Sequence, residues 1–72
     1  MIEQEKINLL ISKKIRELRI ESGDSLQKMG DLLNVSNQQY SKIELGKTRI
    51  FAAQLAVLAD YYSIDVLFFY SE

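Results

Sequence analysis

Apolar residues recur at helical spacing through the first third of the chain. Charged residues occupy most of the other positions, so the pattern predicts one amphipathic helix over residues 3–22. Its apolar stripe consists of Ile7, Leu10, Ile11, Ile15 and Leu18. Gly23 predicts the helix end, because glycine readily adopts the left-handed conformation that follows a helix C-terminus.

Two short helices are predicted next, over residues 26–33 and 37–45. Either Asp24 or Ser25 can cap the first of them, and Ser36 can cap the second. The reason is that a short side-chain oxygen accepts a hydrogen bond from a free N–H group of the first helical turn.

Glycine and asparagine stand at special places in this pair of helices. Gly30 lies in the middle of the first helix, where glycine costs about 1 kcal/mol relative to alanine. It indicates either a merely weak helix or a point where another helix crosses too closely for a Cβ atom. Asn34 lies in the tight link and tolerates a positive φ. The second helix is mostly polar, with Tyr40 and Ile43 able to face inward and Leu45 as a third candidate.

The last third of the chain predicts a helix over residues 51–62 and a short one over residues 66–70, capped by Asp65. No strand pattern has a partner inside the chain, so the predicted fold class is all-α. The predicted core consists of Ile11, Ile15, Leu18, Met29, Leu33, Val35, Ile43, Leu55, Leu58, Tyr62, Ile64, Val66 and Phe69.

Length and composition exclude several classes of protein. A chain of 72 residues forms one small domain, here 1–72, with 1–10 as an N-terminal helical extension and 65–72 as a short C-terminal helix and tail. Without cysteine or histidine, a metal site would need carboxylates alone. We therefore expect no enzyme activity, no metal and no cofactor.

Neither a membrane span nor a signal peptide is predicted. No apolar run reaches the roughly 18 residues of a span. The chain also begins with acidic residues where a signal peptide needs basic ones. We expect a cytoplasmic protein with no membrane partner.

The two short helices, the polar outer face of the second and the basic loop after it are typical of a helix-turn-helix, at about residues 25–45. A helix fits the major groove of B-form DNA, and asparagine or glutamine can each form two hydrogen bonds with adenine. Nine Lys and Arg against ten Asp and Glu give a formal net charge of −1. Because residues 42–49 are locally basic, this balance is compatible with DNA binding.

A set of spaced residues runs from position 11 to position 70. It reads I-x-x-x-I-R-E-L-R at 11–19, Gly23, Ser25-x-x-x-Met29-Gly30-x-x-Leu33-Asn34-Val35-Ser36, Ile43-Glu44-x-Gly46-Lys47 and Leu55-x-x-Leu58-Ala59. This set resembles the Cro/cI (lambda-repressor-like, Xre-type) helix-turn-helix family. The segment from Gln38 to Leu55, together with Phe68 and Phe69, is similar to an alphaproteobacterial branch of it.

The resemblance implies a compact five-helix domain that binds double-stranded operator DNA as a two-fold dimer on a pseudo-palindrome. Base contacts would come from Asn37, Gln38, Ser41 and Lys42. Phosphate contacts would come from Ser25, Gln27, Lys47, Thr48 and Arg49. Arg19 and Glu44 occupy positions that often form a buried ion pair, the alternative being two solvated surface charges.

Two residues near the expected DNA face depart from the family pattern. Leu26 stands where glutamine is usual, and Asp24 stands where leucine is usual. The C-terminal apolar residues also exceed what a small core holds, so they are either scattered over the surface or form a dimer interface. The interface candidates are Tyr61, Phe68, Phe69 and Tyr70, with Phe69 also counted among the residues that close the core.

We therefore expect a sequence-specific DNA-binding transcriptional regulator, a homodimeric repressor that occludes its operator. The alternative is a protein-interaction module, such as the antitoxin of a toxin–antitoxin pair, whose partner is another protein. Leu26 and Asp24 favour the interaction module, whereas Gln38 and the basic residues 47–49 favour DNA.

Overall fold

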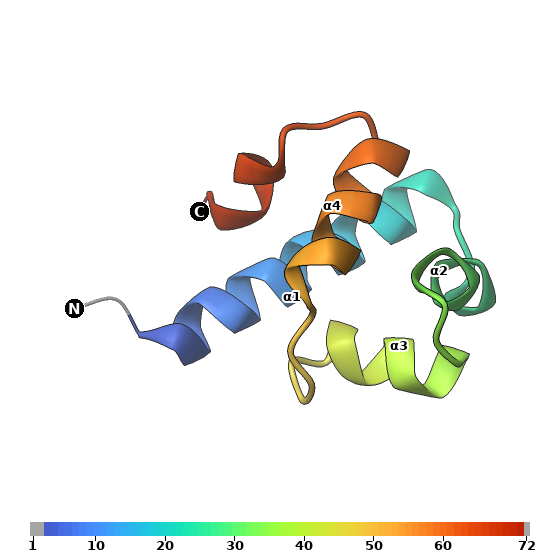
Figure 1. The fold of residues 1–72 in the computed structure, drawn as a ribbon, viewed down its shortest axis with the longest axis horizontal. Coiled ribbons are helices and arrows are strands. Elements are labelled where there is room, and N and C mark those ends of the chain that lie inside the picture. Colours follow the sequence, from blue (N-terminus) through green and yellow to red (C-terminus); the bar gives the residue numbers. More distant parts are fainter. Residues whose placement is uncertain (1–2, 72) are drawn as a thin grey trace.

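Helices account for most of the chain, as the sequence predicts. The structure is a computed structural model that describes residues 3–71, and those residues contain no strand. The elements in chain order are α1 (Gln4–Ser22), α2 (Leu26–Leu33), α3 (Asn37–Glu44), α4 (Ala52–Tyr61) and a 3-10 helix, η1 (Val66–Tyr70). Helix α1 contacts α3 and η1, and α4 contacts α2 and η1 (Figure 1). Within the described chain, no helix has both the length and the apolar character needed to cross a membrane.

The break between α1 and α2 follows the predicted signals. Gly23 adopts φ 74° and ends α1. Ser25 is the residue that caps α2, because its Oγ accepts a hydrogen bond from the backbone N–H of Lys28 at 3.0 Å. Asp24, the other candidate cap, uses its carboxylate elsewhere. The local chemistry of serine therefore sets the start of α2.

The link from α2 to α3 also has the predicted conformation. Asn34 adopts φ 59° directly after α2, and Ser36 Oγ accepts from the backbone N–H of Gln39 at 3.0 Å. Helix α3 ends at Glu44, one residue earlier than predicted, and Leu45 is its C-cap. The expectation that Leu45 can face inward is wrong, because 60% of this residue is exposed beyond the helix end.

Of the two C-terminal elements, α4 is one residue shorter at each end than predicted, and η1 has the predicted bounds. Helix α4 spans Ala52–Tyr61, and Phe51 precedes it as N-cap, its backbone N–H donating to Gln54 Oε1 at 3.0 Å. Asp65 caps η1 as predicted, since its Oδ1 accepts from the N–H of Leu67 at 2.9 Å. Residues 66–70 form a short 3-10 helix, and Phe69 is its buried residue.

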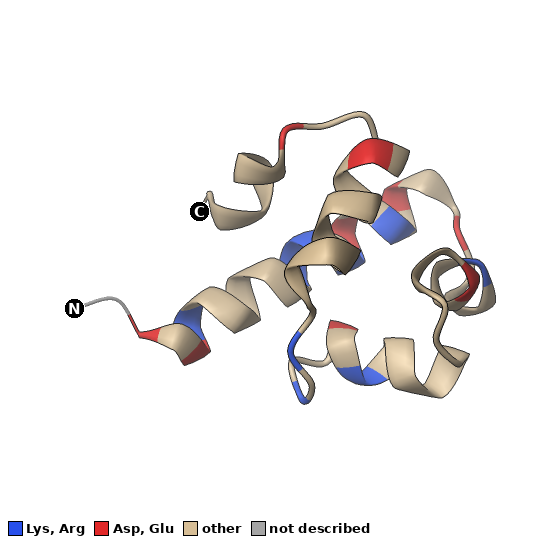
Figure 2. Cartoon of the chain, viewed as in Figure 1, with Lys and Arg blue, Asp and Glu red and all other residues tan. Residues whose placement is uncertain are grey.

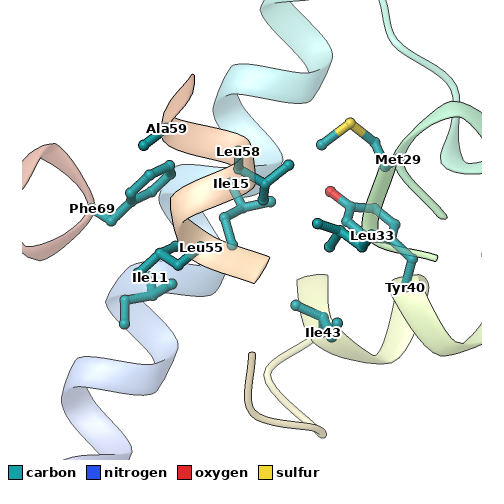
Figure 3. Close-up of a cluster of buried hydrophobic side chains, with 10 residues drawn as sticks. All are labelled: Ile11, Ile15, Met29, Leu33, Tyr40, Ile43, Leu55, Leu58, Ala59 and Phe69. Carbon is teal, nitrogen blue, oxygen red and sulfur yellow. The ribbon is translucent and has the colours of Figure 1, made fainter. Parts of the chain in front are cut away.

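The core lies where α1 to α4 meet, with η1 closing one side (Figure 3). Phe69 is fully buried there, beside Ile11, Leu55 and Ala59. The expectation that Val66 helps to close the core is wrong, because it is 39% exposed. Val66 is the first residue of η1, whereas Phe69, one 3-10 turn further on, places its ring against the core. The buried residues are Ile11, Ile15, Met29, Leu33, Tyr40, Ile43, Leu55, Leu58, Ala59 and Phe69.

Gly30 is required by a close approach of backbone. A Cβ atom at this position would lie 2.8 Å from the carbonyl oxygen of Val35 and 3.3 Å from the amide nitrogen of Asn37. Of the two sequence interpretations, the structure therefore supports close approach. The neighbour, however, is the α2–α3 link with the first residue of α3, and not the body of a crossing helix. The backbone N–H of Val35 donates to the carbonyl of Gly30 at 2.9 Å and holds the link there.

We predict that Gly30→Ala lowers the free energy of unfolding by about 1–3 kcal/mol, because overpacking against backbone outweighs the roughly 1 kcal/mol gain in helix propensity. Urea denaturation followed by circular dichroism measures the change. Helix propensity alone predicts the opposite sign, so a more stable variant would contradict the close approach.

Candidate nucleic-acid interface

Helix α3 has one buried face and one polar, solvent-facing side. Tyr40 and Ile43 are buried and fix the helix against the core. Of the predicted base-contact residues, Asn37, Gln38 and Lys42 are exposed and Ser41 is half-buried. The two apolar anchors therefore hold α3 rigidly while its polar side chains remain accessible.

The loop after α3 is held against the end of that helix. The carbonyl of Lys42 accepts from the backbone N–H groups of Lys47, at 2.9 Å, and Thr48, at 3.3 Å. The side chains of Lys47 and Arg49 are exposed, and Thr48 is half-buried. The predicted phosphate-contact residues 47–49 thus lie next to the predicted base-contact residue Lys42.

The predicted phosphate contacts of α2 lie at its first turn. Ser25 and Gln27 are both exposed. Ser25 Oγ accepts the capping hydrogen bond, and Gln27 Nε2 donates to Asp31 Oδ1 at 3.0 Å. A serine hydroxyl that accepts one hydrogen bond still has its own proton to donate. Leu26 lies between them and is 37% exposed.

Arg49 is not free, which the sequence gave no reason to expect. Its Nη1 donates to Gln4 Oε1 at 2.9 Å, and its Nη2 forms an ion pair with Glu5 Oε1 at 2.8 Å. These partners lie in the first turn of α1. No local pattern connects residues so far apart in the sequence, so the contact comes from the tertiary structure alone.

Arg19 and Glu44 join α1 to the end of α3. Arg19 donates to Glu44 through both Nε and Nη2, the second at 3.2 Å, and its Nη1 donates to the carbonyl of Asp24, also at 3.2 Å. Tyr40 donates its hydroxyl to the same carboxylate. The Glu44 side chain is only 6% exposed and the Arg19 side chain 18%. The pair is therefore half-buried, and its carboxylate has three donors.

This network shifts the ionisation of its donors. The hydrogen bond to Glu44 raises the pKa of the Arg19 guanidinium, which thus stays charged. Burial, reinforced by the hydrogen bond to Glu44, raises the pKa of Tyr40 well above its usual range. The phenol thus keeps its proton and continues to donate at neutral pH.

Two buried polar side chains of α1 add to the same junction. Asn8 Nδ2 donates to the carbonyl of Gly46 at 3.2 Å, and Ser12 Oγ donates to the carbonyl of Ile43 at 2.8 Å. The sequence interpretation missed both residues. A signal was available, because Ser12 follows Asn8 by four residues and Ile15 follows Ser12 by three, which places all three on the buried face of α1. Ser12 satisfies a carbonyl in the last turn of α3, and Asn8 satisfies one just beyond its end.

Asp24, which departs from the family pattern, binds two tyrosines of the α4 end. It accepts hydrogen bonds from the hydroxyls of Tyr61, at 3.1 Å, and Tyr62, at 3.0 Å. The hydrogen bond to Asp24 raises the pKa of Tyr61, and burial together with this carboxylate raises that of Tyr62. These bonds connect the end of α4 to the loop before α2.

The predicted interface aromatics do not form one patch. Tyr61 lies at the α1–α2 loop, with Lys28 Nζ 5.6 Å from its ring centre. Phe68 belongs to η1, and Lys14 Nζ lies 4.9 Å from its ring centre. The assignment of Phe69 to the interface is wrong, because the residue is fully buried in the core. Only Phe68 and Tyr70 remain together, both partly exposed on η1.

Charges are unevenly distributed over the fold. Figure 2 shows basic positions on α3 and the loop after it, whereas α4 and η1 are almost entirely uncharged. The acidic positions at the end of α4 and in the segment before η1 lie on the opposite side of this view from that loop (Figure 2). With Glu44 paired to Arg19, the α3 side carries Lys42 and Lys47 without an acidic partner in the described chain.

Comparison with known proteins relates the chain to helix-turn-helix regulators. A family profile described as Helix-turn-helix, of the Cro/cI type, matches residues 15–69. An uncharacterized HTH-type transcriptional regulator of Rickettsia conorii is 32% identical over 66 residues, covering 92% of this chain and 53% of that protein. One of Sinorhizobium medicae is 32% identical over 76 residues, covering 100% of this chain and 55% of that protein. The chain spans about half the length of the curated relatives it matches.

We predict that Arg19→Met lowers the free energy of unfolding by about 3–5 kcal/mol, because removing one partner leaves the carboxylate of Glu44 buried without a countercharge. Thermal unfolding followed by circular dichroism measures the effect. Lys13→Met, on the exposed face of α1, is the matched control and should change the melting temperature little. Equal effects of both substitutions would mean that the Arg19–Glu44 pair contributes nothing beyond a surface charge.

Proposed function

Because the chain belongs to the Cro/cI-type helix-turn-helix family, whose relatives are named as transcriptional regulators, we propose that it is a sequence-specific DNA-binding regulator. The observation that supports this most is the accessible polar side of α3 beside the basic loop 47–49. A rigid helix with short polar side chains fits the major groove, and adjacent cations attract the phosphates on either side.

The proposed base contacts come from Asn37, Gln38, Ser41 and Lys42. The two amides are suited to adenine and Lys42 to guanine. Their exposure leaves the donors and acceptors available, since no hydrogen bond within the described residues uses these amides.

The proposed phosphate contacts lie on both sides of α3. Ser25 and Gln27 would contribute from the first turn of α2, and Lys47, Thr48 and Arg49 from the loop after α3. Ser25 can donate its hydroxyl proton while it caps α2. Gln27 would have to release Asp31. Lys47 is exposed and forms no ion pair in the described chain, so we expect it to contribute the most.

We further propose that the protein acts as a homodimeric repressor that occludes a pseudo-palindromic operator. The surface that supports a dimer is η1, where Phe68 and Tyr70 are partly exposed and Leu67 is 68% exposed. The segment 66–70 carries no charge, so two copies can approach each other through it without mutual repulsion. A two-fold contact there would have to separate the two α3 helices by about 34 Å, one turn of DNA.

For DNA binding, we predict that Lys47→Ala weakens binding to all DNA sequences alike. The slope of log K against log salt concentration should become shallower by about 0.9, which corresponds to one lost phosphate contact. Gln38→Ala should instead relax the preference at one base position, by about 1–3 kcal/mol. Selection from random duplexes followed by fluorescence anisotropy measures both effects, with Lys13→Ala as the control for loss of a cation outside the interface. An unchanged preference profile in Gln38→Ala would contradict the assignment of α3 to the major groove.

For assembly, we predict a dimer at micromolar concentration that Phe68→Asp converts to a folded monomer with reduced operator affinity, because a charge would be buried against its own copy. Sedimentation equilibrium measures the mass, and circular dichroism verifies the helix content. Leu26→Asp is the matched control for the mass measurement alone, since Leu26 is equally exposed, at 37%, and lies on α2 between two proposed phosphate contacts. A wild-type monomer at about 100 micromolar would exclude a useful dimer and would favour a different protein as the partner of η1.

A further inference from the structure

The first turn of α1 binds Arg49, one of the cations of the proposed DNA-binding surface. Arg49 reaches back from the loop after α3, so that its two terminal nitrogens bind different side chains, Gln4 at 2.9 Å and Glu5 at 2.8 Å. These two contacts between side chains connect the basic loop to the first turn of α1. The contact uses donors that a phosphate would also need.

This ion pair is exposed and therefore exchangeable. The side chain of Arg49 is 55% exposed and that of Glu5 72%, so water screens their attraction. The pair contrasts with the half-buried Arg19–Glu44 pair, in which the carboxylate is 6% exposed and has three donors. Arg49 can leave Glu5 at small cost, whereas Arg19 cannot leave Glu44.

We propose that Glu5 competes with DNA phosphate for Arg49 and thereby sets the affinity of the protein for DNA. This inference rests on the proposed function. Carboxylate and phosphate both bind the guanidinium through its N–H groups, and two anions next to one cation repel each other. While Glu5 is engaged, the pair is neutral and Arg49 releases no counterion from DNA. A phosphate must displace Glu5 before Arg49 contributes.

The opposite effect would follow if Glu5 merely orients Arg49 toward DNA. In that case the loss of Glu5 would weaken binding, because Arg49 would have to be ordered by the phosphate itself. The two possibilities differ in sign, so one measurement separates them.

The test is Glu5→Gln, which keeps the size and hydrogen-bonding capacity of the side chain and removes its charge. The probe is a short DNA duplex of arbitrary sequence, titrated by fluorescence anisotropy over about 50–200 mM salt. We expect binding to be about two- to fivefold tighter at low salt, the range that an exposed ion pair can account for. The slope of log K against log salt concentration should become steeper by up to about 0.9, which corresponds to one additional phosphate contact.

Glu3→Gln is the matched control. Glu3 immediately precedes α1, carries the same charge and pairs with Lys6 within its own turn, at 3.7 Å. Glu3→Gln changes the net charge by the same amount as Glu5→Gln, but Glu3 does not contact Arg49. Arg49→Ala in both backgrounds completes the comparison, and we expect it to weaken binding more in Glu5→Gln than in the wild-type chain. Circular dichroism shows that each variant remains folded.

Equal affinities of Glu5→Gln and Glu3→Gln, or weaker binding by Glu5→Gln, would overturn the competition. If the duplex is bound and Lys47→Ala weakens that binding, such a result would leave the proposed function intact. If neither the wild-type chain nor any variant binds DNA, the proposed function fails and this inference fails with it.

Discussion

The buried carboxylate of Glu44 is the constraint on which the position of α3 depends. A carboxylate removed from water is costly unless hydrogen-bond donors compensate for the loss of solvation. Arg19 of α1 and Tyr40 of α3 supply those donors. Tyr40 and Glu44 both belong to α3, so the contacts from Arg19 are the ones that tie the end of α3 to α1.

Other contacts extend the same junction along α1. Asn8 and Ser12 satisfy backbone carbonyls at and beyond the C-terminus of α3, and Arg49 reaches the first turn of α1. Helix α1 therefore contacts the end of α3 and the loop after it at several points along its length. A rigid support of this kind is what a helix needs if short side chains are to meet base edges in register.

The opposite side of α3 has no comparable network. Its amides and Lys42 face solvent, and Lys47 lies nearby without an acidic partner in the described chain. The net charge of the chain, −1, is therefore a poor guide to what DNA would meet. Glu44 is paired within the fold, and Glu5 is placed directly against Arg49.

Local signals in the sequence determined the helices and their order. Gly23, Ser25, Asn34 and Ser36 act within a few residues of themselves, which is why the ends of α1 and α2 could be predicted. The period of the apolar residues identified most of the core, and the spacing of the motif identified the family. Helix ends without such a local cap, as at Leu45, were placed less well.

Tertiary structure alone decided how neighbouring, chemically similar residues are used. Phe69 is buried and Phe68 is not, although the two are adjacent aromatics, because η1 can present only one ring to the space left by α1 and α4. Asp24 is bound by tyrosines of α4 and Arg49 by Glu5 for the same reason. Such contacts join residues about half the chain apart, and their partners are chosen by three-dimensional proximity, which no local period or propensity encodes.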